Sequence, residues 1–180
     1  MTSKISKSAL GTGLAVLLTV SATTALLSGR GAKADAPAAP QECSALIVPG
    51  KSIGKVHKGM TTNEVEAALG KPERWQGKVM IYDKALGMSV LVHPKTGVSV
   101  VFCGDEMLTY PGFKTFKGRT KDGVGMESSR DDVIAKFGFP TKVEATDIDR
   151  ERMEYKPLGL TFTLESDKVI GLIVDFRSAK

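Results

Sequence analysis

The sequence predicts an α+β fold of two tandem repeats, each a short capped helix packed on a three-strand antiparallel meander. The main observation is an internal repeat. Residues 55–72, "KVHKGMTTNEVEAALGKP", align without a gap on residues 123–140, "GVGMESSRDDVIAKFGFP". Residues that begin and end helices recur at the same places in both copies, and runs of alternating apolar residues follow each copy.

Each copy contains the signals of a short helix. Thr61 and Ser129 are suited to the N-cap position, and Glu64 and Asp132 follow three residues later, as in a capping box. A glycine and then a proline end each helix, at Gly70, Pro72, Gly138 and Pro140. A helix of about nine residues is not stable alone in water. We therefore expect both helices to pack on neighbouring strands.

Three strands are expected after each helix. In the first copy they are "KVMIYD", "GMSVLVH" and "VSVVFC"; in the second, "ERMEYK", "GLTFTL" and "KVIGLIVDF". Tyr82 and Tyr155 recur at equivalent places. The last strand is apolar on both sides, so either it is covered on both faces or it presents an apolar face to a partner.

The N-terminal segment differs from the rest of the chain. Residues 1–34 begin with Lys4 and Lys7, continue with an apolar run and end in a small-x-small site, which is typical of a cleaved bacterial secretory signal. The alternative is an uncleaved membrane anchor. Residues 35–42, "DAPAAPQE", are expected to form a Pro/Ala tether. We expect the first repeat over 43–106, an inter-repeat strand or linker over 107–122, and the second repeat over 123–180.

The net charge gives little support for nucleic-acid binding. The whole chain has 25 Lys and Arg against 20 Asp and Glu. Four of the basic residues and none of the acidic ones lie in residues 1–34, so removing the signal leaves a formal charge of +1. No nucleic-acid partner is expected.

Two cysteines, Cys43 and Cys103, remain in the mature chain. In an oxidising compartment they are expected to form one disulfide, which would stabilise the fold by about 3–4 kcal/mol in the chain-entropy model. The alternative is a pair of buried thiols.

The stretch "IVPGKSIGKVHKGM" (47–60) is not a phosphate-binding loop. A Walker loop has four residues between its glycines and a Ser or Thr after its Gly-Lys pair. Here only three residues separate Gly50 from Gly54, and Val56 follows Lys55. We interpret the stretch as the entry to the first helix.

The segment "GMTTNEVEAALGKPE" (59–73) resembles the helix entry of the small outer-membrane lipoprotein subunit of the β-barrel assembly machinery. The same entry occurs twice in the β-lactamase inhibitory protein, whose tandem helix-plus-sheet repeats are similar in layout. The resemblance implies a scaffold that binds other proteins. The second copy departs from the motif, since Glu127 and Ser128 stand in place of Gly59 and Met60.

No catalytic, metal or cofactor site is predicted, and we do not expect an enzyme. His57 and His93 are the only histidines, and neither has a neighbouring nucleophile or metal-ligand spacing. Asp131 and Asp132 belong to the first turn of a helix, where negative charge is favourable.

The candidate partner-binding residues lie mainly in "TYPGFKTFKGRTKDG" (109–123). Aromatic and basic side chains alternate there, at Tyr110, Phe113, Lys114, Phe116, Lys117 and Arg119. Either they form a surface for an acidic partner, a lipid headgroup or single-stranded nucleic acid, or the aromatics pack between the repeats while the lysines face water. Trp75 and Tyr82 complete the candidate set; Trp75 is either a binding hot spot or a core residue.

These observations predict an exported, non-enzymatic module that binds another protein, most simply an accessory protein of a complex in the periplasm or outer membrane. The alternative is a secreted inhibitor of an extracellular enzyme. A third possibility is a module that binds a membrane surface or a polyanion through residues 110–121.

Overall fold

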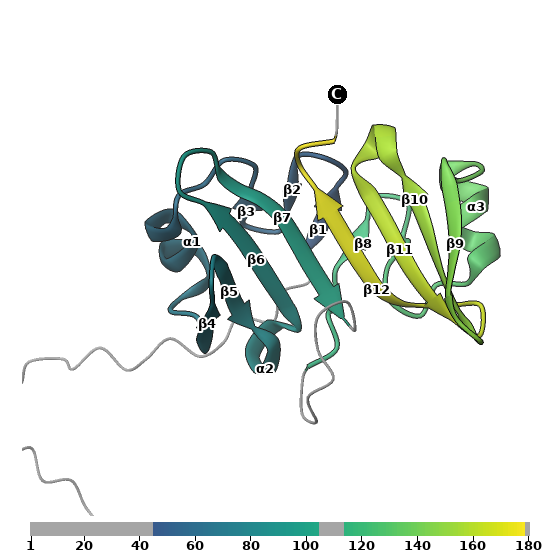
Figure 1. Ribbon diagram of the computed structural model, residues 1–180, viewed down its shortest axis with the longest axis horizontal. Coiled ribbons are helices and arrows are strands. Elements are labelled where there is room, and N and C mark those ends of the chain that lie inside the picture. Colours follow the sequence, from purple (N-terminus) through teal and green to yellow (C-terminus); the bar gives the residue numbers. More distant parts are fainter. Residues whose placement is uncertain (1–44, 105–113, 179–180) are drawn as a thin grey trace, which may run out of the picture. The chain divides into compact units, whose positions relative to one another are not determined.

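The structure is a computed structural model that describes residues 45–104 and 114–178 (Figure 1). The expected signal, the Pro/Ala tether and Cys43 lie outside the described residues. The largest element is an antiparallel sheet of eight strands. In spatial order these are β4 (Arg74–Gln76), β5 (Val79–Tyr82), β6 (Met88–His93), β7 (Gly97–Gly104), β12 (Lys168–Asp175), β11 (Leu160–Glu165), β10 (Arg150–Tyr155) and β9 (Lys142–Asp147).

A second, smaller sheet contains four short strands. Their order is β3 (Val56–His57), β2 (Ser52–Ile53), β1 (Leu46–Val48) and β8 (Arg119–Thr120). The stretch with the Gly-Lys pair thus forms two tight antiparallel connections, β1–β2 and β2–β3. Strand β8 comes from the segment between the repeats and pairs in parallel with β1.

The two predicted capped helices are present. Helix α1 (Thr62–Leu69) follows Thr61, and helix α3 (Arg130–Phe137) follows Ser129. In each, the cap hydroxyl accepts from the backbone N–H of the acidic residue, at 3.4 Å for Glu64 and 3.1 Å for Asp132. The acidic side chain in turn accepts from the backbone N–H of the cap residue, so both capping boxes are confirmed.

The predicted fold class is wrong. The described chain is mostly strand, in sheets of eight and four, and does not consist of two separate three-strand meanders with helix caps. Each helix is followed by four strands, because β4 and β9 come before the three that were expected. The two sets of strands then join into one sheet. The other helical segments described are the single turns α2 (Asp83–Leu86) and η1 (Lys156–Leu158), at equivalent places in the two repeats.

The junction between the repeats is the antiparallel pair β7–β12. Val101 lies opposite Val174, and Cys103 lies opposite Leu172, all four fully buried. Both strands are apolar on both sides, so pairing them buries side chains as well as backbone groups. This is why the two sets of strands form one sheet.

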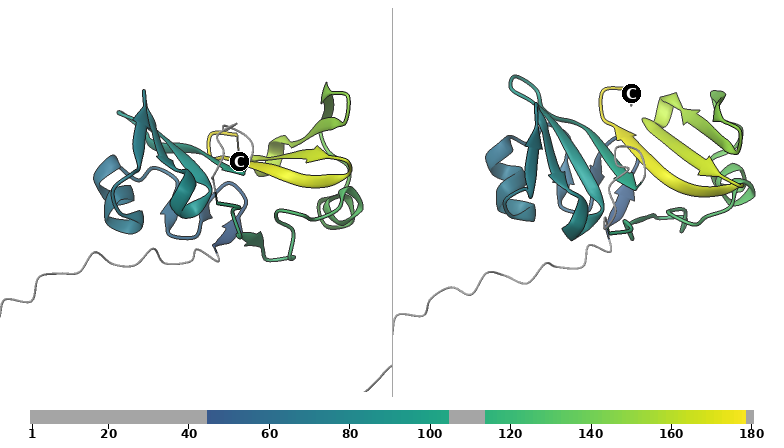
Figure 2. Two further views of the ribbon diagram at one scale, coloured as in Figure 1. Left: turned by 90° about the horizontal axis from the view of Figure 1, so that it is seen from below. Right: turned by 60° about the horizontal axis from the view of Figure 1, so that its bottom comes forward.

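One face of the large sheet carries the hydrophobic core. Helix α1, the small sheet and helix α3 all lie on that side (Figures 1 and 2). Val65 and Val133 from the helices and Ile47 from the small sheet are fully buried in the same cluster as the strand residues. The opposite face of the large sheet carries no helix or strand of the described chain (Figure 2). Among the described residues, no helix has the length and apolar character needed to cross a bilayer.

Candidate binding surface

The face of the eight-stranded sheet that lies away from the helices is called here the open face. Residues directly opposite one another on antiparallel strands point to the same side of a sheet. The pairing therefore places one row of side chains across all eight strands: Arg74, Ile81, Ser89, Phe102, Ile173, Thr161, Glu154 and Lys142.

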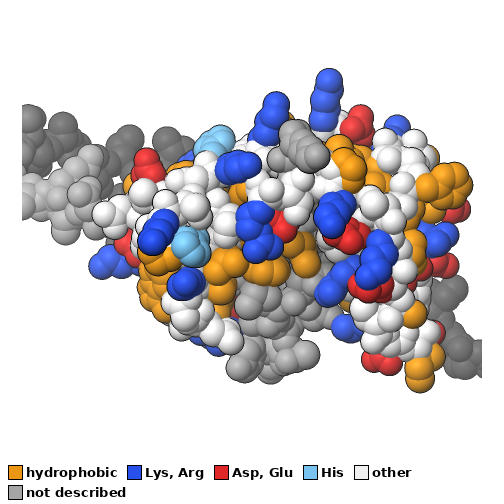
Figure 3. Space-filling view, turned by 45° about the horizontal axis from the view of Figure 1, so that its top comes forward, with side chains coloured by type: hydrophobic (Ala, Val, Ile, Leu, Met, Phe, Trp, Pro, Cys, Tyr) orange, Lys and Arg blue, Asp and Glu red, His pale blue; other side chains and the backbone are white. Residues whose placement is uncertain are grey.

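The half of the open face over β5, β6, β7 and β12 is apolar. Ile81 and Val100 are buried there, outside the main core cluster. Four half-buried apolar side chains accompany them, namely Val79, Leu91, Phe102 and Ile173. In Figure 3 a band of hydrophobic side chains lies among Lys and Arg side chains on this side of the molecule. The four half-buried side chains, unlike Ile81 and Val100, keep apolar area that a partner can cover.

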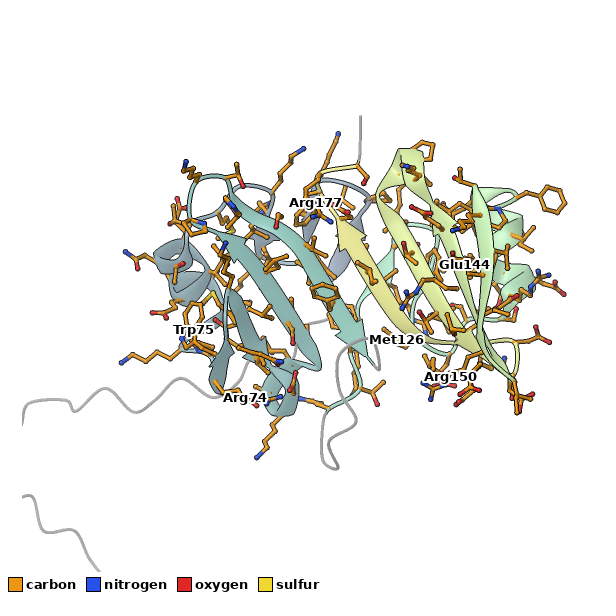
Figure 4. All side chains as sticks on the ribbon, in the orientation of Figure 1. Arg74, Trp75, Met126, Glu144, Arg150 and Arg177 are labelled. Atoms are coloured by element: carbon orange, nitrogen blue, oxygen red, sulfur yellow. The ribbon has the colours of Figure 1, made fainter. Side chains whose placement is uncertain are left out.

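The half over β9, β10 and β11 is charged. The guanidinium of Arg150 lies 2.8 Å from Glu165, and Lys142 forms an ion pair with Glu144 on the outermost strand. The hydrogen bond between these two raises the pKa of Lys142 and lowers that of Glu144. Glu144 and Arg150 lie at the opposite end of the sheet from Arg74 and Trp75 (Figure 4). A partner on this half would meet alternating charges.

A buried carboxylate lies at the outer margin of the apolar half. Asp83 accepts hydrogen bonds of 3.2 Å from Arg74 Nη2 and from Ser89 Oγ. Burial raises the pKa of Asp83, and the hydrogen bonds from Arg74 and Ser89 act in the opposite direction. These contacts attach edge strand β4 to the start of α2 and to β6. Asp83, Arg74 and Ser89, called here the Asp83 cluster, therefore fix the position of β4 at this margin of the sheet.

The structure places Trp75 and Tyr82 differently. Trp75 lies on β4 with its side chain 48% exposed, opposite Met80 on the helix side of the sheet. Tyr82 is buried, and its hydroxyl donates to the carbonyl oxygen of Gly70. Trp75 is thus available to a partner, whereas Tyr82 contributes to packing.

The candidate binding residues between the two repeats also differ in exposure. Tyr110 and Phe113 lie outside the described residues. Phe116 is 1% exposed and belongs to the core cluster, so this aromatic packs between the elements, as in the second interpretation. Lys114 is half-buried, whereas Lys117 and Arg119 are exposed. Arg119 Nη1 donates to the carbonyl oxygen of Gly123 at 2.7 Å, which fixes the turn before α3.

The histidines and Cys103 do not come together. His57 is exposed in β3, His93 ends β6, and Cys103 is fully buried in β7. Burial raises the pKa of the Cys103 thiol well above its usual range. Within residues 45–104 and 114–178, no three His, Cys, Asp or Glu side chains are grouped as metal ligands would be. The disulfide with Cys43 stays a prediction.

Two adjoining hollows lie beside the entry to α3. They have volumes of about 270 and 420 Å³ and share Thr115, Met126 and Glu127 in their walls. Met126 is labelled in Figure 4. Glu127, at the place of Gly59, has a positive φ of 65°. Apolar and charged groups line both hollows without a convergent set of polar side chains.

Sequence reasoning missed three exposed apolar residues of the second repeat. Phe139 and Ile148, on either side of β9, are 88% and 95% exposed, and Val143 within β9 is 45% exposed. The signal that could have identified Phe139 is its place in the repeat. It occupies the position of the charged Lys71.

Comparisons with known proteins leave the family of this chain open. No protein family and no curated protein matched the sequence. One similar solved structure is that of a DUF4309 family protein (YjgB) from Bacillus subtilis. It has a TM-score of 0.41 and 15% sequence identity, over 67% of this chain and 78% of that one.

Another similar structure is an extracellular protein containing an SCP domain from Bacillus anthracis. Its TM-score is 0.38 and its identity 11%, over 64% of this chain and 42% of that one. At these values neither likeness identifies the fold or the function of this chain. The resemblance of residues 59–73 stays a prediction.

Proposed function

We propose that this chain is an exported, non-enzymatic module that binds another protein through the open face of its large sheet. The observation that supports the proposal is the apolar half of that face, where Leu91, Phe102 and Ile173 remain half-buried with no described element above them. Protein interfaces combine such an apolar centre with a polar margin. Here the margin is the charged half and the Asp83 cluster.

The cellular role that fits this proposal best is an accessory or scaffold protein of an envelope complex. The signal-like residues 1–34 support export, and the resemblance of residues 59–73 supports an envelope setting. A secreted inhibitor of an extracellular enzyme is the second candidate, since the same face could cover an enzyme's active-site cleft. A membrane-binding role through residues 110–121 is less well supported, because Phe116 is buried and cannot enter a bilayer.

Site-specific crosslinking in the native cells tests the proposal. A photo-crosslinking residue would replace Phe102 on the open face and, as the control, the exposed Asn63 on helix α1. We expect one defined protein adduct from position 102 and none from position 63. Equal adducts from both positions, or none from 102, would contradict the open face as the binding surface.

A substitution then tests whether the contact is functional. Ile173→Asp places a charge in the apolar half and is expected to abolish the adduct from position 102. Thr161→Asp, on the same row of side chains but in the charged half, is the matched control. Circular dichroism confirms that both variants fold. Fractionation separates the two roles: an adduct in the envelope supports the accessory, and one in the medium supports the inhibitor.

A further inference from the structure

Strand β9 forms one outer edge of the large sheet. All six of its residues are exposed, and within the described chain β9 pairs only with β10. Free edges are normally protected against pairing by lysines, prolines or bulges, and β9 has both a lysine, Lys142, and a bulge. The register shift of the β9–β10 pair leaves Thr146 of β9 without a partner residue, so the bulge in β9 lies beyond Glu144, near the far end of the strand. Residues Lys142, Val143 and Glu144 therefore form a regular, accessible edge.

The charges on this edge are complementary to those of a second copy. Hydrogen-bonded and non-bonded pairs alternate along an antiparallel ladder. A two-fold axis between two copies of β9 must therefore place one residue opposite its own equivalent. Centring the axis on Lys142, Glu144 or Asp147 brings like charges face to face, and centring it on Ala145 or Thr146 pairs no opposite charges. Only Val143 at the centre places Lys142 opposite Glu144 of the second copy, and Glu144 opposite its Lys142.

The side chains around this centre suit such a pairing. Lys142 and Glu144 already form an ion pair within one chain, so two copies would bring together four charges of alternating sign. Val143 lies on the other side of the strand, where it is opposite Met153 and 45% exposed. Two copies would bury these valines against each other. We propose that β9 is a self-association edge that joins two copies of this chain into one continuous antiparallel sheet.

The opposite edge of the sheet lacks this complementarity. Strand β4 has Arg74 and Gln76 on either side of Trp75, which is the equivalent of Val143 in the first repeat. Arg74 is attached to Asp83 of its own chain. Pairing two copies of β4 about a two-fold axis at Trp75 would place Arg74 of one copy opposite Gln76 of the other. The inference is therefore confined to β9, and it is independent of the open face proposed above for partner binding.

Charge reversal tests the proposal in protein produced from the full sequence. Sedimentation equilibrium is expected to show a concentration-dependent dimer. Lys142→Glu and Glu144→Lys should each weaken the dimer by about tenfold or more, because two attractive cross-strand pairs become repulsive. The double variant K142E/E144K restores both pairs and should dimerise as the unmodified chain does. Lys95→Glu, in an exposed turn, changes the net charge equally and should have no effect.

Mixing the two single variants is the most specific test. The chain with Lys142→Glu is acidic at both positions of the edge, and the chain with Glu144→Lys is basic at both. In a mixed pair, each of the two cross-strand contacts therefore joins opposite charges. The mixture should form heterodimers at concentrations at which each variant alone is mostly monomeric. The proposal is overturned if the unmodified chain is a monomer at every concentration. It is also overturned if a dimer persists unchanged in both single variants, or if the mixture shows no association.

Discussion

The hydroxyl of Tyr82 donates a 3.0 Å hydrogen bond to the carbonyl oxygen of Gly70, the residue that ends helix α1. Tyr155 makes the same contact, at 2.9 Å, with the carbonyl oxygen of Gly138 after helix α3. Burial, with the charge of Glu66, raises the pKa of Tyr82 to about 12, and burial also raises the pKa of Tyr155. The same bond thus attaches each helix end to the sheet.

Replacing either tyrosine by phenylalanine should lower the free energy of unfolding by about 0.5–1.5 kcal/mol, because the hydrogen bond between the hydroxyl and the glycine carbonyl is lost. Four strands separate β5 from β10 in the sheet, so the two losses should add in the double variant. Urea denaturation measures both effects. An unchanged midpoint in either single variant would show that water replaces the hydroxyl without cost.

The capping boxes should make stability depend on pH. Hydrogen bonds from Thr61 and Ser129 lower the pKa of Glu64 and Asp132 in the folded state. A carboxylate with a lowered folded pKa stabilises the protein above its unfolded pKa, and this contribution is lost as the pH falls through the folded pKa. Glu64→Gln and Asp132→Asn should therefore reduce stability at neutral pH and have little effect in acid.

Denaturation curves of these variants between neutral and acid pH provide the measurement. The difference between the unmodified chain and each variant should shrink steadily as the pH falls. A difference that stays constant with pH would mean that the charge of the capping side chain does not contribute.

Two glycines should respond differently to the same substitution. Gly97 and Gly123 both have positive φ, at 71° and 85°. A Cβ on Gly97 would lie 2.1 Å from the carbonyl oxygen of Gly59, whereas one on Gly123 would meet nothing within 4 Å. Gly123→Ala should cost about 1 kcal/mol of backbone strain. Gly97→Ala should cost about 3 kcal/mol or more, because backbone must also move. Thermal unfolding of the two variants tests the order, and equal losses would contradict it.

The two cysteines give a test of the predicted disulfide. Cys103 is fully buried, so an alkylating reagent should not modify it in the folded protein. If Cys43 and Cys103 are bonded, the unfolded chain should resist alkylation until a reductant is added, and should then gain two adducts. Mass spectrometry of the alkylated chain measures the number of adducts. Adducts in the denatured chain without reductant would show that the thiols are free.

The helices could be predicted from the sequence because their signals are local. Thr61 with Glu64, and Ser129 with Asp132, specify each start within four residues. The strand after each helix could not be predicted in the same way. Every residue of β4 and β9 is exposed, so neither strand has the apolar alternation that identifies a half-buried strand. The strands of the small sheet other than β1 have only two residues each.

The open face could not be predicted from any short segment of the sequence, because it depends on which strands become neighbours. The apolar half of the open face exists because β7 pairs with β12, and sequence alternation does not specify which strands become neighbours. Strict alternation along β12 would place Ile170 on the side of Leu172 and Val174. A register shift in the β11–β12 pair instead leaves Val169 fully buried and Ile170 half-buried. The repeat alignment does predict that Trp75 and Val143 occupy equivalent positions. In the structure Trp75 lies opposite Met80, and Val143 lies opposite Met153, the methionine at the same place in the second repeat.

The pairing of β7 with β12 has a consequence for the order in which the chain folds. Strand β7 finds its second neighbour about 70 residues further along the sequence. Contacts between such distant segments slow folding, because the intervening chain must be ordered before they form. Until β12 arrives, the apolar strand β7 has an unpaired edge that favours association with other chains. Folding of the first repeat is therefore complete only when β12 has been synthesised, and a chain that ends before Lys168 should accumulate as an aggregating intermediate.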